Sequence, residues 1–184
     1  MNANGEMQQY WYLEDGKYYF LGANGSVRTG WQNIWGKWYY LDGNGVMQTY
    51  WQIINGHYYF FGGLSDGVMR TGWQNIWGKH YYFNSDGEMQ YGWQKLNGVW
   101  YYLGGASDGA MKTGWQTIDG DKYYFQSDGA MTTGAATIDG KKYEFDSDGA
   151  LREENKTEEL YQITGTSKVT VSQMVKCYNT YSSI

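Results

Sequence analysis

Residues 30–47 read Gly-Trp-Gln-Asn-Ile-Trp-Gly-Lys-Trp-Tyr-Tyr-Leu-Asp-Gly-Asn-Gly-Val-Met. Two short runs of β-favouring residues in this stretch, 31–34 and 37–41, flank a glycine. Such a pair of runs around a glycine turn predicts a β-hairpin. The dipeptide Asn44-Gly45 then supplies a second turn, because glycine reaches positive φ without a steric penalty.

The same pattern recurs along the chain at intervals of 20 or 22 residues. Its first tryptophan aligns at Trp11, Trp31, Trp51, Trp73, Trp93 and Trp115, with Ala135 at the seventh position. The two longer repeats carry their extra residues at 62–65 and 104–107, after the aromatic triplet, which places a loop there. A lone two-stranded hairpin is marginally stable in water, so each repeat must bury its aromatic residues against the next. We therefore predict an all-β solenoid, a superhelix of stacked hairpins without a central core.

The repeats also predict how the chain is organised. They form an array over residues 1–151, with about seven hairpins, and residues 1–10 match the closing half of a further repeat. Three substitutions suit the seventh repeat to a capping role, namely Ala135, Glu144 and Leu151. Residues 152–184 are expected to form a linker and the start of a C-terminal segment, with a short helix over 172–178.

The composition narrows the class of protein. Among 184 residues there are 27 Gly, 20 Tyr and 10 Trp but no Pro, which excludes a collagen. The net charge of −5 without a basic patch argues against a nucleic-acid partner. No apolar run approaches the roughly 20 residues that span a bilayer, and no signal peptide precedes the repeats. Cys177 is the only cysteine and no Cys/His cluster has zinc spacing, so neither a metal nor a cofactor is expected.

The acidic residues do not predict catalysis. Those of the second turns recur with the repeat, as Asp66, Asp86, Asp108, Asp128 and Asp148. Turn formation explains them without an acid–base pair. Neither His57 nor His80 has a nucleophile partner in the pattern. We therefore expect no enzymatic activity in this chain.

The aromatic residues are the candidate binding residues. Alternation along a strand places Trp38 and Tyr40 on one face and Tyr39 and Leu41 on the other. Neighbouring hairpins can therefore enclose an aromatic-walled pocket, which suits a quaternary ammonium ion through cation–π contacts. The same rings would equally serve as packing or stack on sugars, and their spacing alone leaves these alternatives open.

The Gly-Trp pair, the triplet Trp38-Tyr39-Tyr40 and the following Met47 together resemble the choline-binding (cell-wall-binding) repeat family. These repeats occur in murein hydrolases, phage lysins and bacterial surface proteins. The resemblance covers residues 1–151 and implies choline sites between consecutive hairpins. It implies a secreted, non-catalytic module that binds choline or phosphocholine of teichoic acids at the bacterial surface. A homodimer is compatible with the sequence.

In that family each site uses the Trp of Gly-Trp, the residue that opens the triplet, a Tyr of the next triplet and often a Met. Two sets in this chain have a second tryptophan: Trp31, Trp38 and Tyr59 with Met47, and Trp93, Trp100 and Tyr123 with Met111. Two have a tyrosine instead: Trp11, Tyr18 and Tyr39, and Trp51, Tyr58 and Tyr81 with Met69. The fifth set contains Trp73, His80 and Tyr101 with Met89. Protonated His80 would repel a cation, so this site should weaken as the pH falls.

The last two repeats depart from the family pattern. Lys122 and Lys142 open their triplets, and a fixed ammonium opposes a second cation. Residues 120–125 and 140–145 look like the related repeats of clostridial toxins and glucan-binding glucosyltransferases, which implies a carbohydrate partner as the alternative function. Residues 163–176 resemble the lead-in to a glucosaminidase-type hydrolase domain, which implies the targeting part of a murein hydrolase.

Overall fold

The computed structural model describes residues 10–154, with side chains up to Arg152. The chain divides into two compact units, the first ending at Lys112 and the second beginning at Thr113. All regular secondary structure from residue 10 to residue 154 is β-strand, which confirms the predicted all-β class. This range contains no helix that could cross a membrane. The helix predicted over 172–178 lies outside the described residues.

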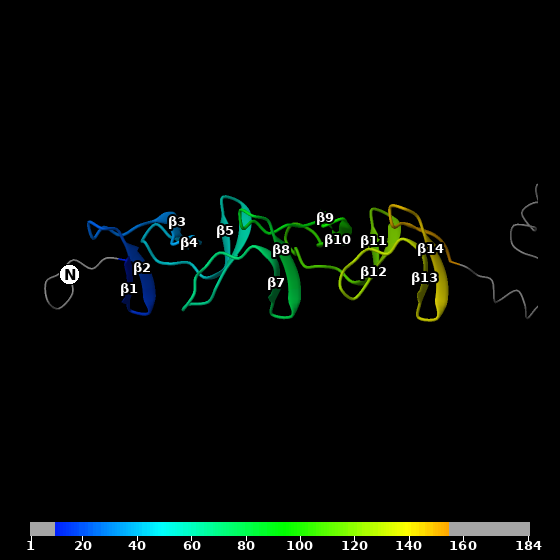
Figure 1. Cartoon of the computed structure of the whole chain (residues 1–184), viewed down its shortest axis with the longest axis horizontal. Helices are drawn as coiled ribbons and strands as arrows, with labels where there is room; N and C mark the ends of the chain where they lie inside the picture. The colour runs from blue at the N-terminus through cyan, green and yellow to red at the C-terminus, as the bar shows by residue number, and fades with distance from the viewer. Residues whose placement is uncertain (1–9, 155–184) are drawn as a thin grey trace, which may run out of the picture. The chain divides into compact units, whose positions relative to one another are not determined.

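The first unit consists of five antiparallel hairpins. They are β1 (Tyr10–Glu14) with β2 (Lys17–Leu21), β3 (Gly30–Ile34) with β4 (Lys37–Leu41), β5 (Tyr50–Ile54) with β6 (His57–Phe61), β7 (Gly72–Ile76) with β8 (Lys79–Phe83), and β9 (Trp93–Leu96) with β10 (Val99–Tyr102). In Figure 1 the hairpins β1–β2 and β7–β8 point to the same side, and β5–β6 points to the opposite side. The hairpins of this unit therefore wind about a common axis, as predicted for a solenoid.

The second unit contains one hairpin and one three-stranded sheet. Its strands are β11 (Gly114–Ile118), β12 (Asp121–Phe125), β13 (Gly134–Ile138), β14 (Lys141–Phe145) and β15 (Leu151–Glu154). Strand β15 pairs with β14, where Leu151 lies opposite Phe145. The strand continues to Glu154, three residues beyond the boundary expected at residue 151. The terminal repeat thus closes with a third strand at its edge.

The core is divided into clusters that successive hairpins share. The hairpin β5–β6 buries the residue before its turn, Ile54 (6% exposed), and the last residue of its second strand, Phe61 (0% exposed). These two pack with Tyr59 of the same hairpin, and the preceding hairpin contributes Trp31 and Tyr40. Equivalent clusters surround Leu41 and Phe83. No single centre holds the first unit together, which agrees with the prediction of stacking without a central core.

The second turns are stabilised by their own side chains. The carboxylate of Asp42 accepts hydrogen bonds from the backbone N–H of Asn44 and Val46, each at 2.9 Å. Asp146 does the same for Asp148 and Ala150. In the longer repeats the turn carboxylate of Asp66 forms an ion pair with Arg70, and that of Asp108 with Lys112. Of the carboxylates expected to serve the turns, those of Asp66, Asp108 and Asp128 make such contacts, the last with the backbone N–H of Ala130 at 3.0 Å.

The hairpin turns are two residues long, with positive φ at both positions, which is the type I′ geometry favoured in hairpins. Five hairpins place Asp or Asn first in this turn: Asp15, Asn55, Asn97, Asp119 and Asp139. The other two place Trp35 (φ 50°) and Trp77 (φ 51°) there. Tyr10 (φ 72°) and Tyr50 (φ 56°) likewise adopt positive φ where the remaining repeats have glycine.

These four aromatic residues occupy strained backbone positions. An L-residue other than glycine in the left-handed region costs about 1–2 kcal/mol. The other repeats place Asn, Asp or glycine there, which adopt this conformation at lower cost.

One prediction concerns the contact between a second turn and the preceding repeat. Gly87 and Gly36 have nearly the same φ, +82° and +80°, but an added Cβ at Gly87 would overlap the Met69 side chain, whereas at Gly36 it would meet nothing within 4 Å. We expect Gly36→Ala to lower the free energy of unfolding by about 1 kcal/mol through backbone strain alone. Gly87→Ala should lower it by about 2–4 kcal/mol, because Met69 must also move. Urea unfolding of both variants measures the difference, and equal losses would contradict this packing.

Candidate functional site

The tryptophan of each Gly-Trp pair lies between two successive hairpins. The Trp31 ring centroid lies 5.2 Å from that of Tyr40 in its own hairpin and 5.0 Å from that of Tyr59 in the next. Both contacts are edge-to-face, the preferred arrangement of aromatic pairs. The corresponding contacts with the next hairpin are Trp11–Tyr39 (4.9 Å), Trp51–Tyr81 (5.0 Å) and Trp73–Tyr101 (5.1 Å). At these four junctions the structure brings together the middle tyrosine of a triplet and the preceding tryptophan, which the predicted sets group together; their binding of choline stays a prediction.

The residue that opens the triplet provides a further wall. Trp38 stands nearly perpendicular to Trp31, at 83° and 6.4 Å, and Trp100 has the same relation to Trp93, at 88° and 6.3 Å. With Tyr59, the first pair forms a corner of three rings that is open to solvent, since Trp38 is 44% exposed. Such a corner presents several π faces to one small cation.

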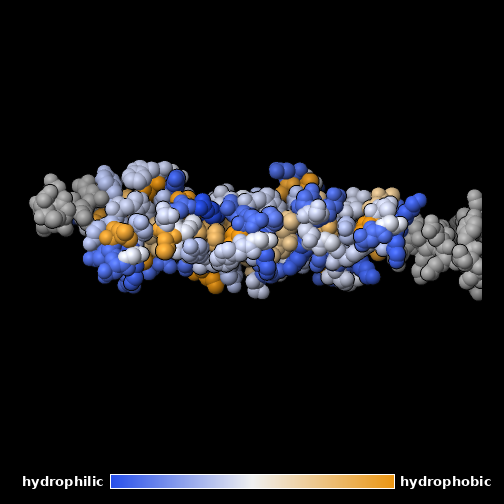
Figure 2. Space-filling view, turned by 90° about the horizontal axis from the view of Figure 1, so that it is seen from below, coloured by the Kyte–Doolittle hydropathy of each residue, from blue (hydrophilic) through white to orange (hydrophobic). Residues whose placement is uncertain are grey.

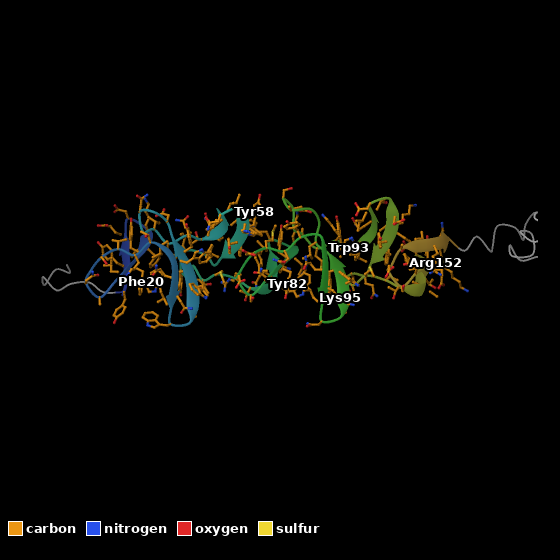
Figure 3. The ribbon with its side chains drawn as sticks, turned by 90° about the horizontal axis from the view of Figure 1, so that it is seen from above. Phe20, Tyr58, Tyr82, Trp93, Lys95 and Arg152 are labelled. Carbon is orange, nitrogen blue, oxygen red and sulfur yellow. The ribbon has the colours of Figure 1, made fainter. Side chains whose placement is uncertain are left out.

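The fifth hairpin already places a cation at this wall. Lys95 pairs across the hairpin with Trp100, and its Nζ lies 5.6 Å from the centroid of the Trp100 ring. Figure 3 shows Lys95 and Trp93 on this hairpin. Other repeats have Asn33, Ile53, Asn75 or Thr117 at the position of Lys95. The Trp100 ring thus already has an ammonium group beside it, and the binding of choline at this ring stays a prediction. Tyr123 of the same predicted set lies on β12 in the second unit, and its grouping with Trp93 and Trp100 stays a prediction.

Each methionine lies beside the aromatic residues of a different repeat from the one with which the sequence analysis grouped it. The backbone N–H of Met69 donates to the carbonyl of Trp38 at 2.8 Å, and Met69 packs on the cluster that contains Trp31 and Tyr59. In the same way Met47 bonds to Tyr18, Met89 to Tyr58 and Met111 to His80, each at 2.8 Å. Each methionine therefore lies beside the triplet of the repeat before its own. The expected pairings of Met47 with Trp38, Met69 with Tyr58, Met89 with His80 and Met111 with Trp100 differ from this placement by one repeat.

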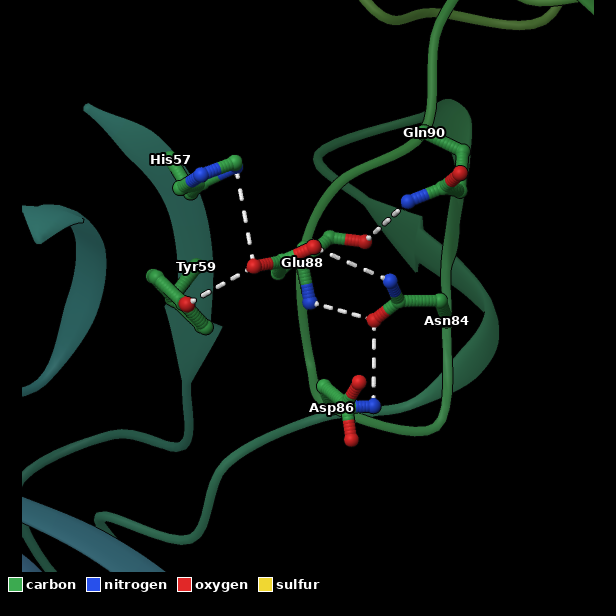
Figure 4. A network of polar contacts seen from close by, with 6 residues as sticks. All are labelled: His57, Tyr59, Asn84, Asp86, Glu88 and Gln90. Carbon is green, nitrogen blue, oxygen red and sulfur yellow. Dashed lines mark hydrogen bonds and ion pairs between the residues drawn. The ribbon is translucent and has the colours of Figure 1, made fainter. Parts of the chain in front are cut away.

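A carboxylate that the sequence analysis did not single out lies beside the Trp31–Trp38–Tyr59 corner. The hydroxyl of Tyr59 donates to Glu88 Oε1 at 3.4 Å, and His57 Nδ1 lies 3.6 Å from the same oxygen (Figure 4). Asn84 Nδ2 donates to Glu88 Oε2 at 3.1 Å. This network orients the tyrosine and adds negative charge, which favours a cation nearby. The signal in the sequence is that Val46, Val68, Ala110 and Ala130 stand before the methionine in four other repeats, where this repeat has a glutamate.

The tyrosines that contact the tryptophan of the preceding hairpin have raised pKa values. Burial raises the pKa of Tyr39, Tyr59 and Tyr81 above the ordinary value for tyrosine. The nearby carboxylates of Asp66, Glu88 and Asp108 raise these pKa values further, in that order. These tyrosine side chains therefore stay neutral over the whole physiological pH range.

The site with histidine has a polar contact of its own. His80 Nε2 lies 3.3 Å from Asn75 Nδ2, which is across the hairpin. The ring is exposed, so it keeps its access to solvent and to protons. Loss of cation binding on protonation of His80 stays a prediction.

The second unit contains a pocket at the equivalent position. A cavity of about 280 Å³ is lined by Trp115, Gln116, Thr117, Lys122, Tyr143 and Leu151. Trp115 and Tyr143 meet edge-to-face at 4.8 Å, as in the first unit. Lys122 replaces the aromatic wall and has no ion-pair partner among the described residues. Within residues 10–152, no group of three or more His, Cys, Asp or Glu side chains could hold a metal ion.

The sequence model of the choline-binding repeat matches residues 28–71, 70–113 and 112–152. The chain belongs to the choline-binding repeat family. The three matches join end to end and contain all hairpins from β3 onward. Comparison with curated proteins gives no match.

Solved structures of this family share the fold. Choline binding protein F of Streptococcus pneumoniae, in the presence of a peptidoglycan analogue, matches with 41% identity and a TM-score of 0.73 over 79% of this chain and 52% of that chain. CbpJ of the same organism matches with 36% identity and a TM-score of 0.73, over 79% and 52%. The autolysin LytC of S. pneumoniae shares the fold at 24% identity and a TM-score of 0.51, over 83% and 39%. This chain spans about half the length of the CbpF and CbpJ structures.

The raised tyrosine pKa values predict an alkaline limit to stability. Because the folded pKa lies above the unfolded value of about 10, the stabilisation is complete below pH 10 and is lost as the pH rises further. We expect the free energy of unfolding, measured with urea, to be lower at pH 10.5 than at pH 8. Tyr81→Phe should reduce this fall, and Tyr91→Phe at an exposed position should not. Equal pH dependence in the two variants would contradict the assignment.

Proposed function

We propose that this chain is a non-catalytic module that attaches a larger secreted protein to choline on (lipo)teichoic acid of a bacterial surface. The observation that carries the proposal is the three-ring corner of Trp31, Trp38 and Tyr59, which recurs in modified form at other junctions between hairpins. A ring contributes about 0.5–2 kcal/mol to cation binding, so three rings give dissociation constants in the millimolar to sub-millimolar range.

Several weak sites suit attachment to a polymer. Cell-wall teichoic acids present many choline groups, and binding at one site raises the local concentration at the others. A module of this kind needs no catalytic residues, and the turn carboxylates are engaged in their own loops. The proposed activity is therefore retention at the surface.

The first test is thermal unfolding with and without about 50 mM choline chloride, with NaCl at equal ionic strength as the reference. A site with a millimolar dissociation constant should add about 2 kcal/mol by linkage. Trp38→Lys copies the residue of the sixth repeat and should remove the contribution of one site. Val99→Lys adds the same charge one residue before a triplet, where other repeats carry Lys37 and Lys79, and should leave the choline effect unchanged. No choline effect on the unmodified chain would overturn the proposal.

A second candidate function rests on the pocket of the second unit. Its free ammonium disfavours choline, while its rings and the polar groups of Gln116 and Thr117 suit a sugar with hydrogen-bonding or acidic substituents. We propose this carbohydrate function as the alternative for the Lys-bearing repeats.

The reciprocal variant separates the two functions. Lys122→Trp should create an additional aromatic corner with Trp115 and Tyr143, and should increase the choline-induced shift in unfolding midpoint. On a glycan array the same variant should lose signals that depend on Lys122. An unchanged choline shift together with an unchanged array profile would assign the pocket to neither ligand.

A further inference from the structure

The four aromatic residues with positive φ occur in two matching combinations. Each hairpin that begins with tyrosine, Tyr10 or Tyr50, is followed by a hairpin whose turn begins with tryptophan, Trp35 or Trp77. Every hairpin that begins with glycine is followed by a turn with Asn or Asp. Both tryptophans stand in the same octapeptide, Gly-Trp-Gln-Asn-Ile-Trp-Gly-Lys, at 30–37 and 72–79. The tyrosine and the tryptophan thus occur together or not at all.

The paired residues are in contact and exposed. The ring centroids of Tyr10 and Trp35 lie 5.9 Å apart at 42°, and those of Tyr50 and Trp77 lie 6.4 Å apart at 36°. Trp35 is 74% exposed and Trp77 is 76% exposed. We call each Tyr–Trp pair an aromatic shelf.

Each shelf is supported from the hairpin that carries its tyrosine. Phe20 contacts Tyr10 at 6.2 Å, and Phe60 contacts Tyr50 at 6.4 Å. Phe60 also meets Trp77 edge-on at 6.2 Å and 89°. Phe60 thus contacts both rings of its shelf and Phe20 contacts the tyrosine of the other, while both indoles stay about three-quarters exposed.

We propose that the two aromatic shelves are carbohydrate-binding surfaces, each of which stacks on the face of a neutral pyranose ring in a glycan chain. The face of an aromatic ring carries partial negative charge, and the C–H bonds on the face of a sugar ring carry partial positive charge. Exposed rings held in a strained backbone position are typical of sites where the strain serves a function. The shelf rings are not among the rings of the predicted choline sets, although Phe20 and Phe60 also contact Trp11 and Trp51, so this proposal does not rest on choline binding.

Other ligands fit the shelves less well. A cation on an indole that is about three-quarters exposed stays hydrated and gains little. Nucleic-acid bases also stack on aromatic rings, but a net charge of −5 repels their phosphates. A protein partner needs roughly 800 Å² per side, far more than two rings offer. On the face that Figure 2 shows, hydrophobic residues lie in separate patches among hydrophilic ones.

The variant that tests the shelves comes from the chain itself. Asn occupies the Trp35 and Trp77 position in the third and fifth hairpins, as Asn55 and Asn97, and it adopts the same positive φ there. The double variant Trp35→Asn/Trp77→Asn should therefore fold, with an unfolding midpoint equal to or above that of the unmodified chain. Leu64→Ala is the matched control, because Leu64 is 62% exposed outside the shelves and Ala106 stands at its position in the other 22-residue repeat.

The measurement is native electrophoresis of the full chain in gels that contain glycol chitin or dextran. We expect retardation of the unmodified chain and of Leu64→Ala in at least one of these gels. The double variant should bind that polysaccharide at least about ten-fold more weakly. Its stabilisation by choline should persist, which separates the outcome from that of the cation sites.

Two results would overturn the proposal. One is the absence of retardation of the unmodified chain in both gels. The other is equal retardation of the double variant and the control. If the second result came with a lower unfolding midpoint, the shelves would serve to join neighbouring hairpins.

Discussion

The first unit depends on the contact between each Gly-Trp tryptophan and the tyrosine of the next hairpin. No strand of one hairpin in this unit forms a sheet with a strand of another. The recurring backbone link between hairpins is the bond from a methionine N–H to the carbonyl that opens the preceding triplet, such as Met69 to Trp38. Aromatic packing must therefore supply most of the cohesion, and the rings that join the hairpins are also the rings that line the candidate sites.

The sequence predicts that a tyrosine of one hairpin contacts the Gly-Trp tryptophan of the hairpin before it, because both positions recur along the array, but it leaves open which of the two adjacent tyrosines does so. Alternation in a strand separates Tyr39 from Tyr40, and the requirement to bury aromatic surface directs one of them to the neighbouring hairpin. No such local signal indicates which hairpin each methionine contacts. After Leu41 the chain turns at Asp42 and runs back, so that Met47 reaches Tyr18 of the previous hairpin. Alignment of the repeats groups residues by sequence, whereas the loop returns each methionine to the hairpin before it.

The features that sequence reasoning missed are the departures from the average repeat. Glu88 takes a place that Val or Ala has in four other repeats, and it reaches Tyr59 across the junction between hairpins. Trp35 and Trp77 take the place of Asn or Asp in a turn with positive φ. The consensus of the repeats predicts the fold, because every hairpin must satisfy the same turns and burial. Chemical differences between sites come from single positions where that consensus is broken.

The position that opens the triplet is well placed for such differences. Its backbone is fixed by pairing across the hairpin, as between Asn33 and Trp38 or between Thr117 and Lys122, while its side chain remains exposed. A change from Trp to Lys there reverses the charge preference of a pocket without removing a core residue. The residue opposite has a similar influence, since Lys95 supplies a cation to Trp100 from the paired strand. Two facing positions in each hairpin can thus set the ligand preference of a junction, while the buried Ile and Phe keep the hairpins stacked.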